Sequence, residues 1–346
     1  MLIASLRSFA ARTSSADTSN RSAIPSSRLA GQLRQAENRS ALPPGQEDRR
    51  PNPLDGLSTR QPLERLDNPQ AKQRLHDSAL LANFPYSRDL GSLSHTQWQP
   101  DTELARLLAK GTKLEFQPQQ GRLLDPRSGL VAYVFRNKAE GEIRLVFGGT
   151  TSGSGVGDLM PRNLKNLGNV ARQWRANISN AVFGGRPDCY IQAAQLTHKL
   201  QQLAAGLPLM RAGEPTYTVS IGGHSLGGGM AAYAAMKLST PQHPIQAECF
   251  SSAQFGRGLQ RELLGLHGDD PARAREASAN INHYYIKGDI VPTMDGLFSV
   301  RHVGQLYQLP ADHRADDSRV GRHDKFLDHV KDFAASTREG RSKFYG

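Results

Sequence analysis

Cysteine is scarce in this sequence, and that scarcity excludes two classes of architecture. Only Cys189 and Cys249 occur among the 346 residues, which is too few for a disulfide-bonded scaffold or a thiolate zinc site. The spacings His-x-Glu and His-Glu-x-x-His are also absent, so no zinc-hydrolase motif is present. We therefore expect no bound metal.

Long apolar runs are missing as well. No stretch approaches the roughly 18 consecutive apolar residues that are needed to span a bilayer. The first ten residues are too short and too polar for the hydrophobic part of a secretory signal peptide. The sequence therefore predicts no transmembrane segment.

Acidic residues are rare near the N-terminus, where Asp17 is the only one before Glu37. This region is rich in Ser, Arg, Gln, Asn and Pro, and we predict that residues 1–75 form a disordered leader before a folded domain at 76–346. The composition favours an uncleaved bacterial type III secretion signal, with delivery into a host cell. An organelle transit peptide and an untargeted tail on a cytoplasmic protein are the alternatives.

Basic residues outnumber acidic ones over the whole chain, and the formal net charge is +11 at pH 7. Such a surplus favours peripheral contact with an anionic membrane surface, although an effect on solubility alone is the alternative. The basic residues are dispersed and no nucleic-acid-binding motif is present, so we expect no nucleic-acid partner.

From about residue 76, segments with strand and helix patterns alternate. Strands are predicted at residues 130–135, 143–147, 247–251, 281–286 and 300–309, and helices at residues 74–83, 103–110, 190–205, 230–238, 260–266 and 325–335. Strands that alternate with helices predict an α/β fold with a mostly parallel central sheet and helices on both faces.

The most specific pattern is Gly223-His224-Ser225-Leu226-Gly227, which follows a β-branched strand and precedes an Ala-rich helix. A serine on a sharp strand-to-helix turn, a nucleophile elbow, exposes its hydroxyl, and the flanking glycines avoid collisions with neighbouring backbone. The helix beginning after Ser225 directs free N–H groups toward a developing oxyanion. We interpret Ser225 as a candidate nucleophile; a surface serine in a glycine-rich loop is the alternative.

A second glycine-rich segment, residues 148–157, follows the strand predicted at 143–147. No Gly-Lys-Ser/Thr follows it and Gly-x-Gly-x-x-Gly does not match, which argues against a phosphate-binding loop. A loop after a strand and upstream of the elbow is where α/β-hydrolases place an oxyanion donor. In that case Thr150 contributes its backbone N–H as a hydrogen-bond donor to the oxyanion, and the direction of that N–H decides whether it can do so.

A nucleophilic serine needs a base, and the base needs a carboxylate that holds its tautomer. In α/β-hydrolases the acid follows the serine and the histidine follows the acid. Asp289 lies just after the strand predicted at 281–286, and Val291-Pro292 ends that strand. Asp295, in a turn-like Met-Asp-Gly setting, is the alternative.

Four histidines follow these acids. His323 precedes the final helix in a loop from which its ring can reach the carboxyl edge of the sheet, so it is the preferred base, ahead of His329 and then His302. His313 lies in a polar loop with three aspartates nearby. We expect His224 to support the elbow rather than act as the base.

Residues 158–187 contain apolar side chains at roughly helical spacing, interrupted by glycines. A core helix is the default interpretation. A lid that opens at a lipid surface is the alternative, and it requires Trp174 and Phe183 to be exposed near the catalytic loop.

Taken in order, these segments resemble the class 3 lipase family, the group of fungal triacylglycerol lipases and plant phospholipases A1. Residues 145–152 are similar to its Phe-Arg-Gly-Thr/Ser oxyanion loop. Residues 223–228 are similar, residue for residue, to its Gly-His-Ser-Leu-Gly-Gly elbow, and residues 288–292 to its Asp-x-Val-Pro acid loop.

Other segments of the sequence are less similar to that family, and two depart from its pattern. Residues 301–304 resemble its structural His-x-Gly strand, and His323 with Phe326 resembles its final His-x-x-aromatic pattern. Gly148 replaces the arginine of the oxyanion loop, and residues 251–254 lack the proline of the family's Phe-Gly-x-Pro element. The resemblance spans about residues 76–335.

The resemblance implies an α/β-hydrolase fold with a triad of Ser225, Asp289 and His323, and an oxyanion hole made by the backbone N–H groups of Thr150 and Leu226. It implies a lipase or phospholipase A that hydrolyses lipid acyl esters without a cofactor. A small-ester esterase and a non-enzymatic lipid-binding module on a degenerate hydrolase fold remain alternatives.

A reporter fusion tests the secretion signal. Residues 1–70 fused to an export reporter are expected to direct the reporter out of a bacterium that carries a type III system. Retention of the reporter in the cell under all conditions would contradict the prediction.

Overall fold

A computed structural model describes residues 54–149, 188–207, 217–240, 243–289, 291–292, 300–311 and 319–336. All of them belong to the unit that runs from Pro51 to Gly346. No helix among these described residues is long and apolar enough to cross a membrane.

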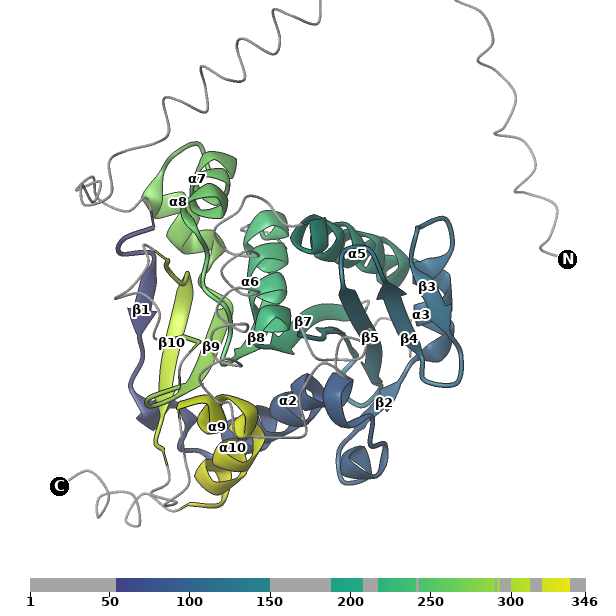
Figure 1. Ribbon diagram of the computed structural model, residues 1–346, viewed down its shortest axis with the longest axis horizontal. Helices are drawn as coiled ribbons and strands as arrows, with labels where there is room; N and C mark the ends of the chain where they lie inside the picture. The colour runs from purple at the N-terminus through teal and green to yellow at the C-terminus, as the bar shows by residue number, and fades with distance from the viewer. Residues whose placement is uncertain are drawn as a thin grey trace, which may run out of the picture. The chain divides into compact units, whose positions relative to one another are not determined.

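The fold is organised around a ten-stranded sheet with the strand order β1-β10-β9-β8-β7-β6-β5-β4-β3, and β2 pairs with β5 beside this path (Figure 1). The strands are β1 (Ser58–Arg60), β2 (Trp98–Pro100), β3 (Glu115–Gln117), β4 (Arg122–Asp125), β5 (Leu130–Asn137), β6 (Glu142–Phe147), β7 (Thr218–His224), β8 (Gln246–Phe250), β9 (Ile281–Ile286) and β10 (Gly304–Leu309). In this spatial order, the neighbouring strands β1, β10, β9, β8, β7 and β6 are parallel to one another. The neighbouring strands β6, β5, β4 and β3 are antiparallel. The prediction of a mostly parallel sheet is confirmed.

The register of the parallel strands brings their carboxyl ends to one edge of the sheet. Phe147 at the end of β6 is level with Gly223 in β7, and His224 at the end of β7 is level with Phe250 at the end of β8. Phe250 in turn is level with Tyr284 in β9. The segments that follow these strands therefore meet at this edge, which is where open α/β sheets place their functional groups.

Helices cover both faces of the sheet (Figure 1). Along β5, Leu130, Ala132 and Val134 belong to the apolar cluster that includes α5 and α6, whereas Val131 and Tyr133 belong to the cluster that includes part of α2. This alternation is the period of two that a strand buried on both faces requires. The helices are α2 (Pro69–Ser87), α3 (Thr102–Ala109), α5 (Asp188–Ala205), α6 (Leu226–Leu238), α7 (Arg257–Leu266), α8 (Pro271–Ala277), α9 (Arg319–Asp324) and α10 (Phe326–Ala335), with short 3-10 turns at Leu63–Leu66 and Gly91–Leu93.

Helix α2 is longer than the helix predicted at residues 74–83. The side chain of Asn68 accepts a hydrogen bond from the N–H of Ala71 at 2.7 Å, and Pro69 occupies the first turn, where its missing N–H is not needed. The helix ends where Arg88 takes a left-handed conformation with φ 52°. The extra last turn carries Tyr86 toward the carboxyl edge of the sheet.

The folded part includes residues that the sequence analysis assigned to the leader. Leu54 and Leu57 are buried, and β1 pairs in parallel with β10. Strand β1 could not be predicted from composition, because Ser58–Arg60 is short and polar and its partner strand lies more than 200 residues away in the sequence. The boundary at residue 75 is therefore corrected to a position before Leu54; residues 1–53 lie outside the described part of the chain.

Strand β10 is shorter than the strand predicted at residues 300–309, because it spans only Gly304–Leu309; Gly304 pairs with β1, and residues 305–309 pair with β9. Gly304 has a φ of 86°, and a Cβ at this position would lie 2.7 Å from the carbonyl oxygen of Ser278. Arg301 instead pairs with Phe255 in an isolated bridge. A turn that only glycine tolerates therefore precedes the strand.

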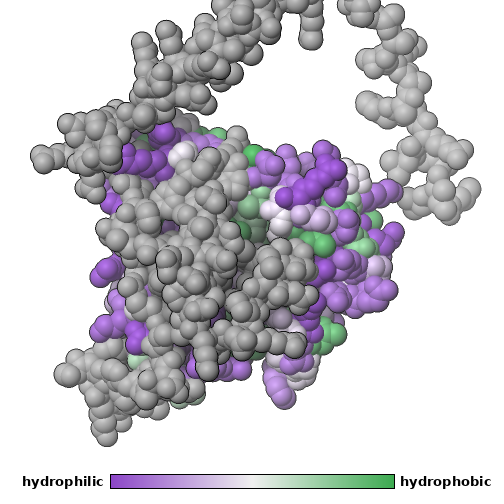
Figure 2. Space-filling view, in the orientation of Figure 1, coloured by the Kyte–Doolittle hydropathy of each residue, from purple (hydrophilic) through white to green (hydrophobic). Residues whose placement is uncertain are grey.

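The described surface is mainly hydrophilic in the view of Figure 2. Among the described residues, Leu90 and Leu266 are the large apolar side chains with high exposure.

Candidate active site

Ser225 occupies a sharp turn between β7 and α6. Its φ of 57° and ψ of −125° lie in a region that residues with a side chain rarely adopt. Two hydrogen bonds hold this turn: Ser225 N–H donates to the carbonyl of Phe250 at 3.0 Å, and Ala253 N–H donates to the carbonyl of Ser225 at 3.0 Å. The neighbouring strand β8 and the segment after it therefore stabilise the strained residue.

Glycines are required around Ser225 because the backbone segments approach very closely. A Cβ at Gly223 would lie 2.6 Å from the carbonyl oxygen of Phe147, and a Cβ at Gly227 would overlap that same oxygen. A Cβ at Gly228 would lie 2.7 Å from Cβ of Ser252. The geometry thus explains the spacing of the Gly-x-Ser-x-Gly pattern and the glycine after it.

Asp289 lies in the turn that ends β9. Gly288 before it has a φ of 86°, and a Cβ at Gly288 would overlap the guanidinium of Arg322. The Asp289 carboxylate is completely buried and accepts a hydrogen bond from the N–H of Val291 at 2.9 Å. This turn directs the carboxylate inward rather than toward solvent.

His323 lies in the short helix α9, not in a loop as the sequence predicted. Its Nδ1 is 3.1 Å and 3.2 Å from the two carboxylate oxygens of Asp289, and both side chains are fully buried. Because an ionised carboxylate only accepts hydrogen bonds, Nδ1 carries the proton. Nε2 of a neutral His323 is then the nitrogen that can accept a proton, the tautomer that a general base needs.

His224, which directly precedes Ser225 in the chain, contacts His323. Nε2 of His224 lies 3.1 Å from the carbonyl oxygen of His323, and the two rings are 4.5 Å apart. The hydroxyl of Ser225 is buried and makes no hydrogen bond within the described part of the chain. The structure therefore brings Asp289 and His323 together, and it shows no hydrogen bond between Ser225 and His323. Catalytic hydrogen bonds are often long or poorly aligned without substrate.

The other candidates for base and acid lie elsewhere. His302 is buried with its ring 4.5 Å from that of His283, and burial followed by the charge of His283 lowers the pKa of His302 well below its usual range. It contacts neither Ser225 nor Asp289 among the described hydrogen bonds, and His329 is buried in α10. Asp295, His313 and residues 158–187, with the lid alternative, lie outside the described residues.

The predicted oxyanion loop begins beside Ser225. Gly148 and Gly149 follow β6, and a Cβ at Gly149 would lie 3.3 Å from Cβ of Ser225. Leu226 is the first residue of α6, where backbone N–H groups are free to bind an anion. Thr150 lies outside the described residues, so its N–H stays a prediction.

Tyr86 is a residue that the sequence analysis missed. Its hydroxyl lies 3.0 Å from the backbone nitrogen of Gly149 and 3.1 Å from Nδ1 of His224. No local pattern could have found it, because 138 residues separate Tyr86 from His224 and it does not belong to any motif. Only the tertiary fold brings the end of α2 to the elbow.

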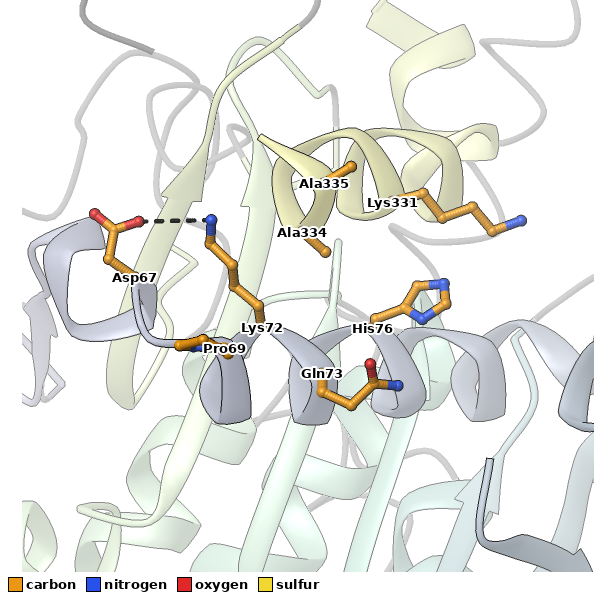
Figure 3. Close-up of a pocket in the computed structure, with 8 residues that line it drawn as sticks. All are labelled: Asp67, Pro69, Lys72, Gln73, His76, Lys331, Ala334 and Ala335. Atoms are coloured by element: carbon orange, nitrogen blue, oxygen red, sulfur yellow. Dashed lines mark ion pairs between the residues drawn. The ribbon is translucent and has the colours of Figure 1, made fainter. Parts of the chain in front are cut away.

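Two cavities among the described residues lie away from these groups. One, of about 500 Å³, lies between α2 and α10 (Figure 3) and is lined by Lys72, His76 and Lys331, with Lys72 already paired to Asp67 at 3.9 Å. The other, of about 860 Å³, is lined by residues at the amino ends of β6 to β9. Neither is lined by Ser225, Asp289 or His323, so neither is the place of the predicted chemistry.

The described residues contain no group of three or more His, Cys, Asp or Glu side chains that could hold a metal ion. The buried ionisable groups at this edge instead contact one another, as Asp289 and His323 do.

Comparisons with known proteins identify a family. The family model described as phospholipase-like, Tle-like phospholipase domain, matches residues 77–319. No curated protein sequence matches the chain.

Solved structures with similar chains are fungal lipases at low identity. Lipase II from Rhizopus niveus is 18% identical with a TM-score of 0.40, over 69% of this chain and 81% of that one. The Lip2 lipase from Yarrowia lipolytica is 18% identical with a TM-score of 0.40, over 69% and 79%. A triacylglycerol lipase from Penicillium expansum is 16% identical with a TM-score of 0.41, over 70% and 81%.

The close approach at the elbow generates a stability prediction. Gly227→Ala is expected to lower the free energy of unfolding by about 1–3 kcal/mol, because its methyl group would overlap the Phe147 carbonyl and force the backbone apart. The matched control is Gly258→Ala in α7, where no atom lies within 4 Å of the new Cβ. There the change is expected to stabilise the helix by up to about 1 kcal/mol. Denaturant unfolding measures both, and equal stabilities of the two variants would contradict the close approach.

Proposed function

The chain belongs to the Tle-like phospholipase domain family, and on that premise we propose that it hydrolyses acyl esters of lipids with Ser225 as nucleophile, His323 as base and Asp289 as the orienting acid. The observation that carries this proposal is the strained Ser225 turn at the same sheet edge as the buried Asp289–His323 pair. A turn of this kind has a conformational cost, which surrounding contacts offset.

The roles follow from the positions of the side chains. Ser225 Oγ attacks the ester carbonyl carbon as His323 Nε2 takes the hydroxyl proton, and the carbonyl π electrons move onto the oxygen. The collapse of this tetrahedral oxyanion releases the alcohol, which receives the proton from His323, and leaves an acyl group on Ser225. Water, deprotonated by His323, then attacks the acyl carbon. The second tetrahedral intermediate collapses with cleavage of the bond to Ser225 Oγ, His323 returns its proton to that oxygen, and the fatty acid is released. Asp289 holds the Nδ1–H throughout, and no cofactor takes part.

The oxyanion is proposed to be bound by the backbone N–H groups of Leu226 and Thr150. Leu226 begins α6, whose first-turn N–H groups and positive dipole end face the Ser225 turn. The loss of one such donor costs about 3–4 kcal/mol of transition-state stabilisation in serine hydrolases.

The family supports a lipid substrate, and the net charge of +11 supports contact with an anionic phospholipid surface. We also propose that the acid-poor, Ser- and Arg-rich residues that precede the fold serve delivery into another cell, where such membranes are found. The export-reporter fusion described above is the test of that second proposal.

Fatty-acid release from phosphatidylglycerol vesicles tests the proposed reaction. Wild-type protein is expected to release fatty acid, and Ser225→Ala is expected to lose roughly 10³-fold or more of the rate. Ser239→Ala is the matched control, because Ser239 is a buried serine at the opposite end of α6 whose hydroxyl accepts the N–H of Ile245. It is expected to retain the rate.

The outcomes separate the alternatives. Turnover of short soluble esters without release from vesicles would replace lipid hydrolysis by small-ester hydrolysis. Vesicle binding that survives Ser225→Ala, with no turnover of either substrate by wild-type protein, would replace catalysis by lipid binding.

A further inference from the structure

The hydroxyl of Tyr86 is a junction between two segments of the candidate site. It lies 3.0 Å from the backbone nitrogen of Gly149, next to the predicted oxyanion donor, and 3.1 Å from Nδ1 of His224, next to Ser225. The Tyr86 ring also packs edge-on against the His224 ring, with centroids 5.3 Å apart. One side chain from α2 thus contacts both the oxyanion loop and the nucleophile turn.

His224 continues this chain of contacts to the base. Its Nε2 lies 3.1 Å from the carbonyl oxygen of His323, and its ring is stacked on Phe326 with centroids 4.1 Å apart. Phe326 opens helix α10, directly after the helix that carries His323. His224 therefore joins the nucleophile strand to the C-terminal helices that position the base.

Only one arrangement of protons satisfies all three contacts. A carbonyl oxygen only accepts, so Nε2 of His224 must donate to His323, and Nδ1 of the neutral ring is then an acceptor. Tyr86 donates its hydroxyl proton to Nδ1 at 3.1 Å, with the carbonyl oxygen of His224 at 3.3 Å as a second, more distant acceptor, and its oxygen accepts the N–H of Gly149. Burial, followed by the charge of His323, holds the pKa of His224 well below its usual range, which keeps the ring neutral.

The absence of a side chain at Gly149 is part of the same arrangement. A Cβ there would overlap the Tyr86 hydroxyl and lie 3.1 Å from the carbonyl oxygen of His224. Tyr86 can reach the loop only because residue 149 is glycine. The Tyr86 hydroxyl therefore contacts the backbone of Gly149 directly, in space that a side chain at residue 149 would occupy.

We propose that Tyr86 and His224 are positioning residues, which fix the oxyanion loop and the base relative to Ser225 through one continuous hydrogen-bond network. The inference rests on the proposed function, because it concerns how that site is held. Networks of this kind in low-dielectric surroundings strengthen each bond and leave each member a single orientation. The network joins three parts of the site that come from distant parts of the sequence: Gly149, His224 and His323.

Removal of the hydroxyl alone tests the inference. Tyr86→Phe keeps the ring that packs on His224 and removes the acceptor of the Gly149 N–H together with the donor to Nδ1. A monomeric short-chain phosphatidylglycerol serves as substrate, so that binding and turnover can be separated. The expected result is a fall in kcat of about 10- to 100-fold, less than the loss of a direct oxyanion donor, with KM changed by no more than about threefold.

A transition-state readout distinguishes positioning from a general structural role. The rate of inactivation by an alkyl phosphonate, whose tetrahedral adduct uses the oxyanion hole, is expected to fall in parallel with kcat in Tyr86→Phe. Tyr233→Phe is the matched control, because Tyr233 lies in α6 and its hydroxyl donates to Glu262 at 2.7 Å, away from the elbow. Its kcat and inactivation rate are expected to match those of wild-type protein.

The outcomes are distinct. If wild-type protein turns over substrate and folded Tyr86→Phe has an unchanged kcat, this inference is overturned and the proposed function stands. An equal fall of kcat in Tyr233→Phe has the same consequence. Absence of turnover in wild-type protein overturns both proposals. Should Tyr86→Phe fail to fold, His224→Gln takes its place: it removes the ring nitrogen that accepts from Tyr86, and the same loss of kcat at constant KM is expected.

Discussion

The close approach of three backbone segments around Ser225 is the constraint on which the rest of the site depends. The carbonyl of Phe147 at the end of β6 lies where a side chain on Gly223 or Gly227 would have to be. The glycines allow this packing, and the packing offsets the cost of order 1–3 kcal/mol of holding a serine at positive φ. The hydrogen bonds from Ser225 to β8 and from Ala253 to Ser225 hold the turn on its other side.

The parallel sheet turns that local constraint into a site. Because β6, β7, β8 and β9 are in register, the residues after each strand meet at one edge. Gly149, Ser225 and Asp289 arrive there from three of these strands, and α9 supplies His323 from the C-terminal part of the chain. The stacking of Phe326 on His224 attaches α10 to the end of β7, so the proposed base is held by the residue that precedes the proposed nucleophile.

Local patterns predicted the parts of this structure that local physics determines. The glycines around Ser225, the strand ending before Asp289 and the major helices each follow from steric or periodic requirements of a few consecutive residues. Strand β1 and the antiparallel strands β2 to β4 were not predicted, because they are three or four residues long and are stabilised by distant partners. Tyr86 was missed because its contacts are likewise with residues distant in the sequence. His323 was predicted in a loop, whereas it lies in the short helix α9, which ends directly before the cap of α10.

The most direct test of the account is to identify the residue that an alkyl phosphonate ester modifies. Such a probe reacts with a serine only where a base activates the hydroxyl and an oxyanion hole accepts the phosphoryl oxygen. Peptide mass spectrometry of the treated protein is predicted to find one covalent adduct, on Ser225, that does not form in His323→Ala. An adduct that forms at the same rate in that variant, on another residue, or not at all would contradict a catalytic site at this elbow.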